Sequence, residues 1–84
     1  MHKIYRTRGT CSRAIEFDLE DGIVKNVLFI GGCSGNTQGV ARLVDGKRAE
    51  DVIGLLGGIS CGGKPTSCPD QLARALAEAL SENA

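Results

Sequence analysis

The hydrophobic pattern of this chain changes its period once, and this change limits the possible fold more than any other feature. Within residues 14–19 apolar and acidic side chains alternate, which is typical of a strand with one buried face. Within residues 70–80 apolar residues recur every three or four positions, which is typical of an amphipathic helix. A chain that begins with one period and ends with the other is expected to form an α+β domain.

Three strands are expected in the first part of the chain. Residues 3–10 and 23–30 are rich in the β-branched and aromatic side chains that favour strands, and they lie on either side of residues 14–19. Asp21 and Gly22 together tolerate the positive φ angles that a tight hairpin turn requires. The sequence therefore predicts a three-stranded antiparallel meander. Its third strand is apolar on both faces, so we expect it to be the best covered of the three.

Three helices are expected after the strands. Apolar spacing predicts a short helix around residues 40–44, ended by Asp45-Gly46, and a second around residues 52–56, ended by Gly57-Gly58. The third covers residues 70–80. With no linker or internal repeat in 84 residues, we expect one domain over residues 1–84, with all three helices packed on one face of the sheet.

Composition excludes several classes of function. Ten basic residues balance ten acidic ones, and only three residues are aromatic, so we expect no general binding of nucleic acid. No apolar run approaches the roughly 20 residues that span a bilayer, and the N-terminus lacks the apolar core of a signal peptide. We therefore expect a cytoplasmic protein that does not engage membranes. His2 is expected to be a surface residue and not a ligand.

The glycine-rich segment Gly58 to Pro65 nearly matches a phosphate-binding loop. The loop pattern ends in Gly-Lys followed by Ser or Thr, whose hydroxyl binds magnesium, and Pro65 stands at that position. No strand is predicted to precede the segment either. The sequence therefore predicts no nucleotide-binding residues, and it offers no candidate catalytic residues of the paired-carboxylate or Ser-His-Asp kind.

All four cysteines fall on predicted connections, outside the strands and the helical stripes. In a reducing cytosol such cysteines indicate metal binding or thiol chemistry more than disulfides. A meander places the turn that holds Cys11 beside the exit of the third strand, which holds Cys33. If the last helix starts at that end, Cys68 completes a triangle and Cys61 could close a tetrahedron around zinc or an iron-sulfur cluster.

The start of the last helix gives Cys68 a special position. Proline suits the first helical position, so Pro69 places Cys68 at or next to the N-cap, and Asp70 complements the positive end of the helix dipole. Free backbone N–H groups there would stabilise a thiolate and make it a better ligand or nucleophile. The alternative is that Cys68 only packs in the core as a small apolar residue.

The run Thr66 to Asp70 reads TSCPD, and the chain resembles the TSCPD domain family named after this motif. GGCSGN upstream and the SCGG loop before the motif fit a free-standing member. The family in turn is similar to the C-terminal region of adenosylcobalamin-dependent ribonucleotide reductases. The resemblance implies a link to deoxyribonucleotide synthesis, and similarity alone would label the chain a ribonucleoside-diphosphate reductase. Because it has no room for that enzyme's barrel or cobalamin site, we do not expect a complete enzyme.

A more distant resemblance is to iron-sulfur scaffold proteins of the IscU and NifU type. The order of strands, turns, helices and cysteines is similar, and their three ligand cysteines match Cys11, Cys33 and Cys68. Two positions differ: Ser67 replaces their histidine, and Arg13 replaces the acidic residue associated with cluster release. Cys61 has no counterpart there. The resemblance thus implies a site that holds its metal more firmly than a transfer scaffold does.

Three hypotheses for function follow. The first is a small metal-binding domain with zinc or an iron-sulfur cluster on four thiolates, serving ribonucleotide reduction as an accessory or electron-delivering module; its ligands are Cys11, Cys33, Cys61 and Cys68. The second is a thiol-disulfide relay for a reductase through Cys61 and Cys68. The third is an interaction module that binds a reductase or another protein and whose cysteines are structural.

Overall fold

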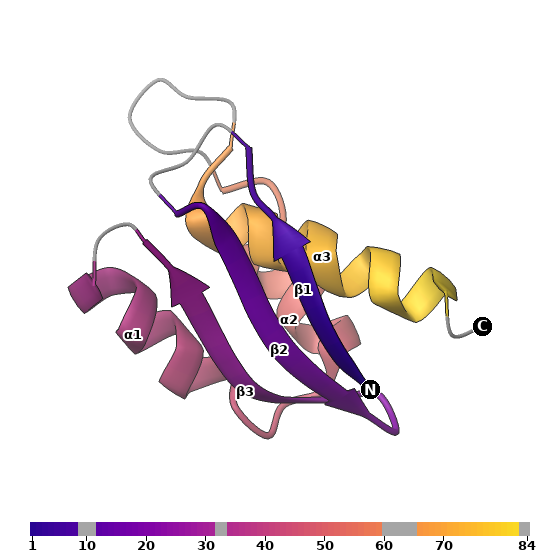
Figure 1. Cartoon of the computed structure of the whole chain (residues 1–84). Helices are drawn as coiled ribbons and strands as arrows, with labels where there is room; N and C mark the ends of the chain where they lie inside the picture. The colour runs from indigo at the N-terminus through magenta and orange to yellow at the C-terminus, as the bar shows by residue number, and fades with distance from the viewer. Residues whose placement is uncertain (9–11, 32–33, 60–65, 83–84) are drawn as a thin grey trace.

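The computed structural model describes residues 1–8, 12–31, 34–59 and 66–82, with the side chains of residues 34–36 excepted. It contains three strands followed by three helices, which confirms the predicted α+β fold (Figure 1). In chain order the elements are β1 (His2–Arg6), β2 (Ala14–Glu20), β3 (Ile23–Ile30), α1 (Ser34–Val44), α2 (Ala49–Leu56) and α3 (Cys68–Glu82).

The sheet is an antiparallel meander in the order β1-β2-β3. Asp21 and Gly22 have φ angles of 52° and 79°, as the predicted hairpin turn requires. At the opposite end Ala14 pairs with Arg6 on one side and with Ile30 on the other. The start of β2 and the ends of β1 and β3 therefore meet at one end of the sheet.

The best covered strand is β2, so the expectation for β3 was wrong. Ile15 and Phe17 of β2 are fully buried, whereas Leu28 of β3 is 56% exposed. The physical reason is position: β2 has a neighbour on both sides, β3 is an edge strand, and the helices lie on one face only (Figure 1). The apolar side chains on the second face of β3 therefore face outward.

The core lies between the inner face of the sheet and α3. Leu72, Leu76 and Ala79 form the predicted stripe of α3 and are fully buried. The helix begins two residues before and ends two residues after the predicted range of 70–80. Helix α2 packs on α3 and α1 packs along β3, so the helices form one layer behind the sheet.

Helices α1 and α2 and strand β1 also differ in length from their predictions, and α2 begins at Ala49, three residues before its predicted start. Helix α1 begins at Ser34, six residues before the predicted start, because its first turns carry small and polar residues that leave no apolar period in the sequence. Strand β1 ends at Arg6 and not at residue 10. Helix α2 has Glu50 and Asp51 in its first turn, where acidic residues complement the dipole. No helix within the described ranges is long and apolar enough to cross a membrane.

Candidate functional site

The TSCPD segment forms the capped start of α3. Ser67 is the N-cap, because its Oγ accepts the Asp70 N–H at 3.1 Å and its carbonyl accepts the Gln71 N–H at 2.8 Å. The Ser67 hydroxyl donates to the carbonyl of Ile59 at 2.7 Å. Cys68 is thus the first helical residue, next to the N-cap as predicted, and Pro69 is the second helical residue and not the first.

Asp70 is a buried carboxylate that binds residues on both sides of the segment before α3. Its side chain is 5% exposed, and its Oδ1 accepts the backbone N–H of Gly58 at 2.7 Å. Its Oδ2 accepts the hydroxyl of Thr66 and lies 3.0 Å from Nε of Arg74, one helical turn on. The hydrogen bond from Thr66 is the largest cause that lowers the pKa of Asp70, helped by Gly58 and Arg74 and opposed by burial. Residues 58 and 66 are therefore held by one ionised group.

Gln71 connects this helix start to the end of β1. It is 2% exposed; its Nε2 donates to the Thr66 hydroxyl at 3.0 Å, and its Oε1 accepts the backbone N–H of Arg8 at 3.1 Å. The Thr66 hydroxyl thus donates to Asp70 and accepts from Gln71, so its hydrogen-bonding capacity is used on both sides.

Cys68 lies against the turn between β1 and β2. Its Sγ is 2.9 Å from Oγ of Ser12, and the residue is 9% exposed. The carbonyl of Ser12 in turn accepts the hydroxyl of Thr7, and the N–H of Arg13 donates to the carbonyl of Ile30 at 2.7 Å. The start of α3 is therefore at the same end of the molecule as the ends of β1 and β3, which is the arrangement that the prediction of a shared cysteine site required (Figure 1).

The predicted ligands are described only in part. Cys68 is in place at the helix start, whereas Cys11, Cys33 and Cys61 lie outside the described residues, and with them the Cys61–Cys68 redox pair. Within the described ranges no group of three or more His, Cys, Asp or Glu residues could hold a metal ion. The described residues that adjoin the three other cysteines most closely in sequence are Ser12, Gly31, Ile59 and Thr66.

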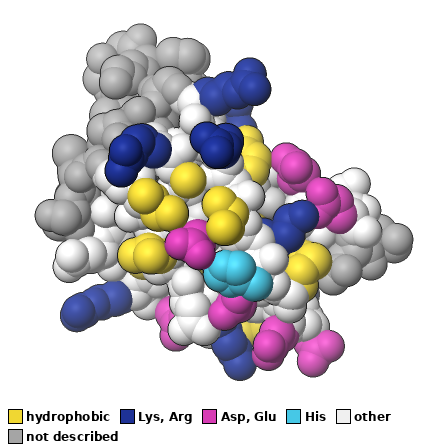
Figure 2. All heavy atoms as spheres, viewed as in Figure 1, with side chains coloured by type: hydrophobic (Ala, Val, Ile, Leu, Met, Phe, Trp, Pro, Cys, Tyr) yellow, Lys and Arg dark blue, Asp and Glu magenta, His cyan; other side chains and the backbone are white. Residues whose placement is uncertain are grey.

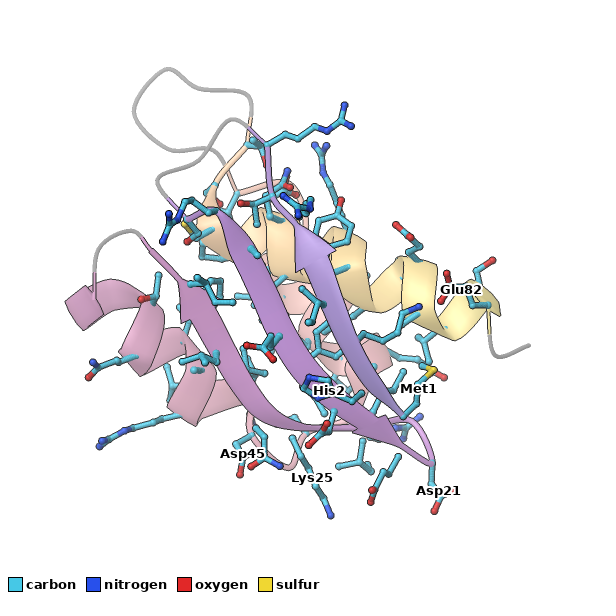
Figure 3. All side chains as sticks on the ribbon, viewed as in Figure 1. Met1, His2, Asp21, Lys25, Asp45 and Glu82 are labelled. Atoms are coloured by element: carbon cyan, nitrogen blue, oxygen red, sulfur yellow. The ribbon has the colours of Figure 1, made fainter. Side chains whose placement is uncertain are left out.

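A second cluster of charged side chains lies at the other end of the sheet, on the face that carries no helix (Figures 2 and 3). Nδ1 of His2 is 2.6 Å from Oδ1 of Asp18, and its Nε2 is 3.0 Å from Oε1 of Glu16. The hydrogen bond to Asp18, and then that to Glu16, raises the pKa of His2 above its ordinary value of 6.5. His2 is a surface residue, as predicted, and it pairs with two carboxylates.

Most of the polar network around α3 was not predicted from the sequence. Asp70 was expected to interact with the helix dipole alone, and Thr66, Gln71 and Ser12 were given no role. One signal was present: Ser67 followed three positions later by Asp70, directly before an apolar stripe, is a capping-box pattern. The partners at Gly58 and Arg8 carry no sequence signal, because they are 12 and 63 residues from the side chains they bind.

Fold and site together define a small α+β domain whose last helix starts in a buried hydrogen-bond network at the end of the sheet. The model of the TSCPD domain matches residues 3–80, nearly the whole chain, and the protein belongs to the TSCPD domain family. TSCPD domains are small domains associated with ribonucleotide reductases. No curated protein and no solved structure matches the chain.

Proposed function

We propose that this TSCPD domain is a cytoplasmic metal-binding module that holds zinc or an iron-sulfur cluster through cysteine thiolates and serves ribonucleotide reduction as an accessory or electron-delivering unit. Its ligands are Cys11, Cys33, Cys61 and Cys68. The observation that carries the proposal is the convergence of the chain at one end of the sheet, where the Sγ of Cys68 meets the Oγ of Ser12.

The hydrogen bonds around α3 support this proposal by tying together segments that adjoin the cysteines. Ser12 follows Cys11, Gly31 precedes Cys33 by two positions, and Ile59 and Thr66 flank the segment that contains Cys61. Ser12 contacts Cys68, and Ile59 and Thr66 are bound to the helix start through Ser67 and Asp70. A structural zinc site needs its ligands from distant segments within a few ångströms. Apart from the Ser12–Cys68 contact, this network holds the segments through serine, threonine and aspartate side chains.

The donors at this end of the molecule fit a thiolate site. Cys68 is at the first position of α3, and its Sγ lies 2.9 Å from Oγ of Ser12. The nearby carboxylate, Asp70, is already bound by Gly58, Thr66 and Arg74, which use three of its roughly four acceptor positions. Sulfur-only ligation favours zinc or iron-sulfur clusters over magnesium or calcium, which prefer oxygen.

The metal itself is the first test. We expect protein purified without added metal and under anaerobic conditions to carry either zinc, or iron with acid-labile sulfide, at about one site per chain. Elemental analysis and the absorbance spectrum distinguish these two results. The proposal is contradicted if the purified chain is metal-free and also fails to bind added zinc. Cobalt serves as the spectroscopic probe of that binding, through the thiolate charge-transfer band.

Serine substitutions test the ligands. We expect Cys33→Ser and Cys68→Ser to abolish stoichiometric zinc binding. The matched control is Ser12→Ala, which removes the partner of Cys68 but no thiol and should leave one zinc per chain. Cys61→Ser decides whether the fourth thiolate is a ligand: we expect weaker binding at unchanged stoichiometry. Undiminished binding by Cys68→Ser would exclude the site.

A second candidate function is the thiol-disulfide relay through Cys61 and Cys68. Two hydrogen bonds favour it, Ser67–Ile59 and Asp70–Gly58. They hold residues 58 and 59, which precede the segment with Cys61, beside the helix start that carries Cys68. In this reaction the two thiols give two electrons and two protons to a partner's disulfide, which is reduced to two thiols while Cys61 and Cys68 form a disulfide. Mass mapping after oxidation should find that pair; thiols that stay reduced and unreactive in the metal-free chain exclude the relay.

The interaction hypothesis predicts a different result in the same experiments. Cysteines that only pack would leave the chain folded without metal, and a reductase partner would still bind after all cysteines are replaced. Circular dichroism of the metal-free chain therefore separates this hypothesis from the metal-binding one.

A further inference from the structure

The outer edge of β3 is divided into a covered half and an open half. In the covered half the N–H of Val24 donates to the carbonyl of Lys47 at 2.9 Å, and the N–H of Gly46 donates to the carbonyl of Val24 at 2.7 Å. The N–H of Asn26 donates to Oδ1 of Asp45 at 3.0 Å. The turn after α1 thus acts as a short fourth strand along the first half of the edge.

The second half of the edge begins after Asn26. Asn26 has a φ angle of 55°, and the pairing of β2 with β3 shifts register at this point. From Val27 to Phe29, no strand in the described part of the chain pairs with β3 on its outer side. Proteins usually cover such edges or protect them with charged residues, because unpaired N–H and C=O groups pair readily with another extended chain.

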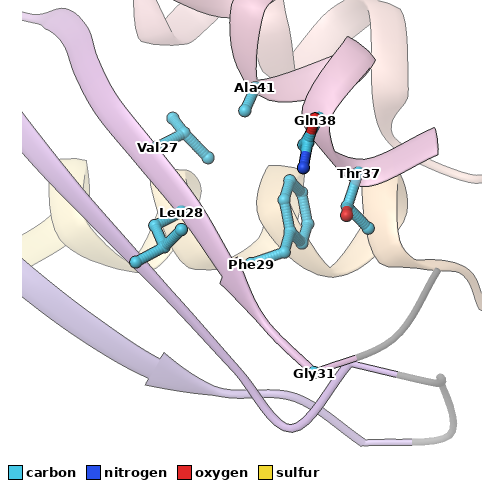
Figure 4. Close-up of a pocket in the computed structure, with 7 residues that line it drawn as sticks. All are labelled: Val27, Leu28, Phe29, Gly31, Thr37, Gln38 and Ala41. Atoms are coloured by element: carbon cyan, nitrogen blue, oxygen red, sulfur yellow. The ribbon is translucent and has the colours of Figure 1, made fainter. Parts of the chain in front are cut away.

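A hollow of about 280 Å³ lies beside this open half, between β3 and α1 (Figure 4). Its lining is mostly apolar on the strand and mixed on the helix: Val27, Leu28, Phe29, Gly31, Thr37, Gln38 and Ala41. The volume is at the lower limit of small-molecule sites, about 300 Å³. It suits one or two side chains of a peptide better than a cofactor.

Positive charge lies at one end of this groove. At that end the side chain of Arg13 lies against Gly31, with Nε 3.3 Å from the position that a Cβ of Gly31 would take. At the other end a second hollow, which shares Val27 and Ala41 with the first, is lined by Arg42. That hollow also contains Asp45, whose carboxylate accepts the Asn26 N–H and keeps its negative charge. The groove is therefore complementary to an apolar segment with an acidic residue at the end near Arg13.

We propose that the groove between the β3 edge at Val27–Phe29 and helix α1 binds an extended peptide segment of a partner protein. The segment adds a strand to β3 through main-chain hydrogen bonds, inserts an apolar side chain into the hollow and places Asp or Glu near Arg13. This site is separate from the proposed metal site, and its occupation does not depend on metal.

The probe that tests the proposal is a displayed library of random dodecapeptides, selected on the full chain. We expect enriched peptides with alternating apolar residues and an acidic residue at one end. The enriched peptide, made synthetically, should bind Ala41→Trp at least about tenfold more weakly, since the indole would fill the hollow. Leu43→Trp is the matched control, because Leu43 is on the same helix, is 72% exposed and does not line the hollow; it should bind as the native chain does.

A second measurement uses the native chain alone, so it holds even if Ala41→Trp does not fold. N-methylation of the enriched peptide at the backbone nitrogens that face β3 should abolish binding, while methylation at the alternate nitrogens should not. No enrichment, equal loss at both sets of nitrogens, or peptides that bind Ala41→Trp undiminished would overturn the proposal. So would a dimer in light scattering that Ala41→Trp converts to a monomer, because the edge would then bind a second copy.

Discussion

Two clusters of charged and polar side chains lie at opposite ends of this domain, and they differ in burial. Around the start of α3, Asp70 and Gln71 are 3% and 2% exposed, and every described buried polar side-chain atom has a partner. On the open face of the sheet, His2 is 54% exposed on its side chain and Asp18 30% (Figure 3). Both clusters shift the pKa of a carboxyl downward, those of Asp70 and Asp18.

The same kind of contact has different consequences in the two places. Water can replace a lost partner on the open face, and salt screens the charges there, so exposed pairs contribute little to stability. Water does not reach the network around α3 as easily, so a lost partner leaves a buried N–H or hydroxyl unpaired. The cluster on the open face changes only the surface, whereas the cluster around α3 fixes the path of the chain near the cysteines.

The largest expected effect is that of Asp70→Ala. Removal of the carboxylate leaves the Gly58 N–H and the Thr66 hydroxyl without their acceptor, which should lower the free energy of unfolding by about 3 kcal/mol. For a domain of this size that corresponds to a fall in Tm of about 15 °C. Calorimetry measures it. The matched control, Asp18→Ala, should shift Tm far less, and equal shifts would remove the distinction between the two clusters.

A smaller effect is expected for the N-cap. Ser67→Ala removes the acceptor of the Asp70 N–H and the donor to Ile59, which should cost about 1 kcal/mol. Amide hydrogen exchange should show faster exchange at Asp70 in the variant. Ser81→Ala is the matched control, since Ser81 is exposed near the other end of the same helix; it should change neither stability nor exchange.

Titration should also distinguish the two clusters by the direction of their pKa shifts, because folding lowers the pKa of Asp70 and raises that of His2. The pKa of Asp70 is lowered on folding, so its stabilising contribution is complete above the ordinary value of 3.8 and is lost as the pH falls through the folded pKa. The difference in Tm between the native chain and Asp70→Asn should therefore be constant above pH 3.8 and become smaller below that pH. A difference independent of pH throughout would show that Asp70 is not ionised in the folded protein.

The smallest expected effect belongs to His2. The pKa of His2 is raised on folding, so its contribution to stability is complete below pH 6.5 and is lost as the pH rises through the folded pKa. NMR titration of the ring protons should give a pKa above 6.5 that moves back toward 6.5 in Asp18→Asn or in high salt. A pKa at or below 6.5 in the native chain would contradict the pairing with Asp18 and Glu16.

The elements that the sequence predicted well are those whose signal is local. The Asp21-Gly22 turn, the alternation of β2 and the apolar stripe of α3 each depend on residues a few positions apart, and all three are confirmed. Helix α1 was predicted too short because its first turns carry no apolar period. The coverage of β3 was predicted wrongly because apolar content cannot distinguish a central strand from an edge strand.

Only the part of the candidate site that follows from the order of the strands and helices was predicted. The sequence placed Cys68 beside a helix N-cap and expected the strand ends and the helix start to meet, and the contact of Cys68 with Ser12 agrees. Whether Cys11, Cys33 and Cys61 join it stays a prediction, because these three lie outside the described residues. The distant resemblance to iron-sulfur scaffolds likewise stays a prediction.

By itself the sequence determined the order of the elements, the hairpin, the helix start and the family, because each is encoded by neighbouring residues or by a short motif. Only the tertiary structure decided that Asp70 and Gln71 are buried anchors for Gly58 and Arg8, and that half of the β3 edge has no pairing strand among the described residues. The physical reason is that burial and edge exposure depend on which distant segments pack together, and packing leaves no period in the sequence.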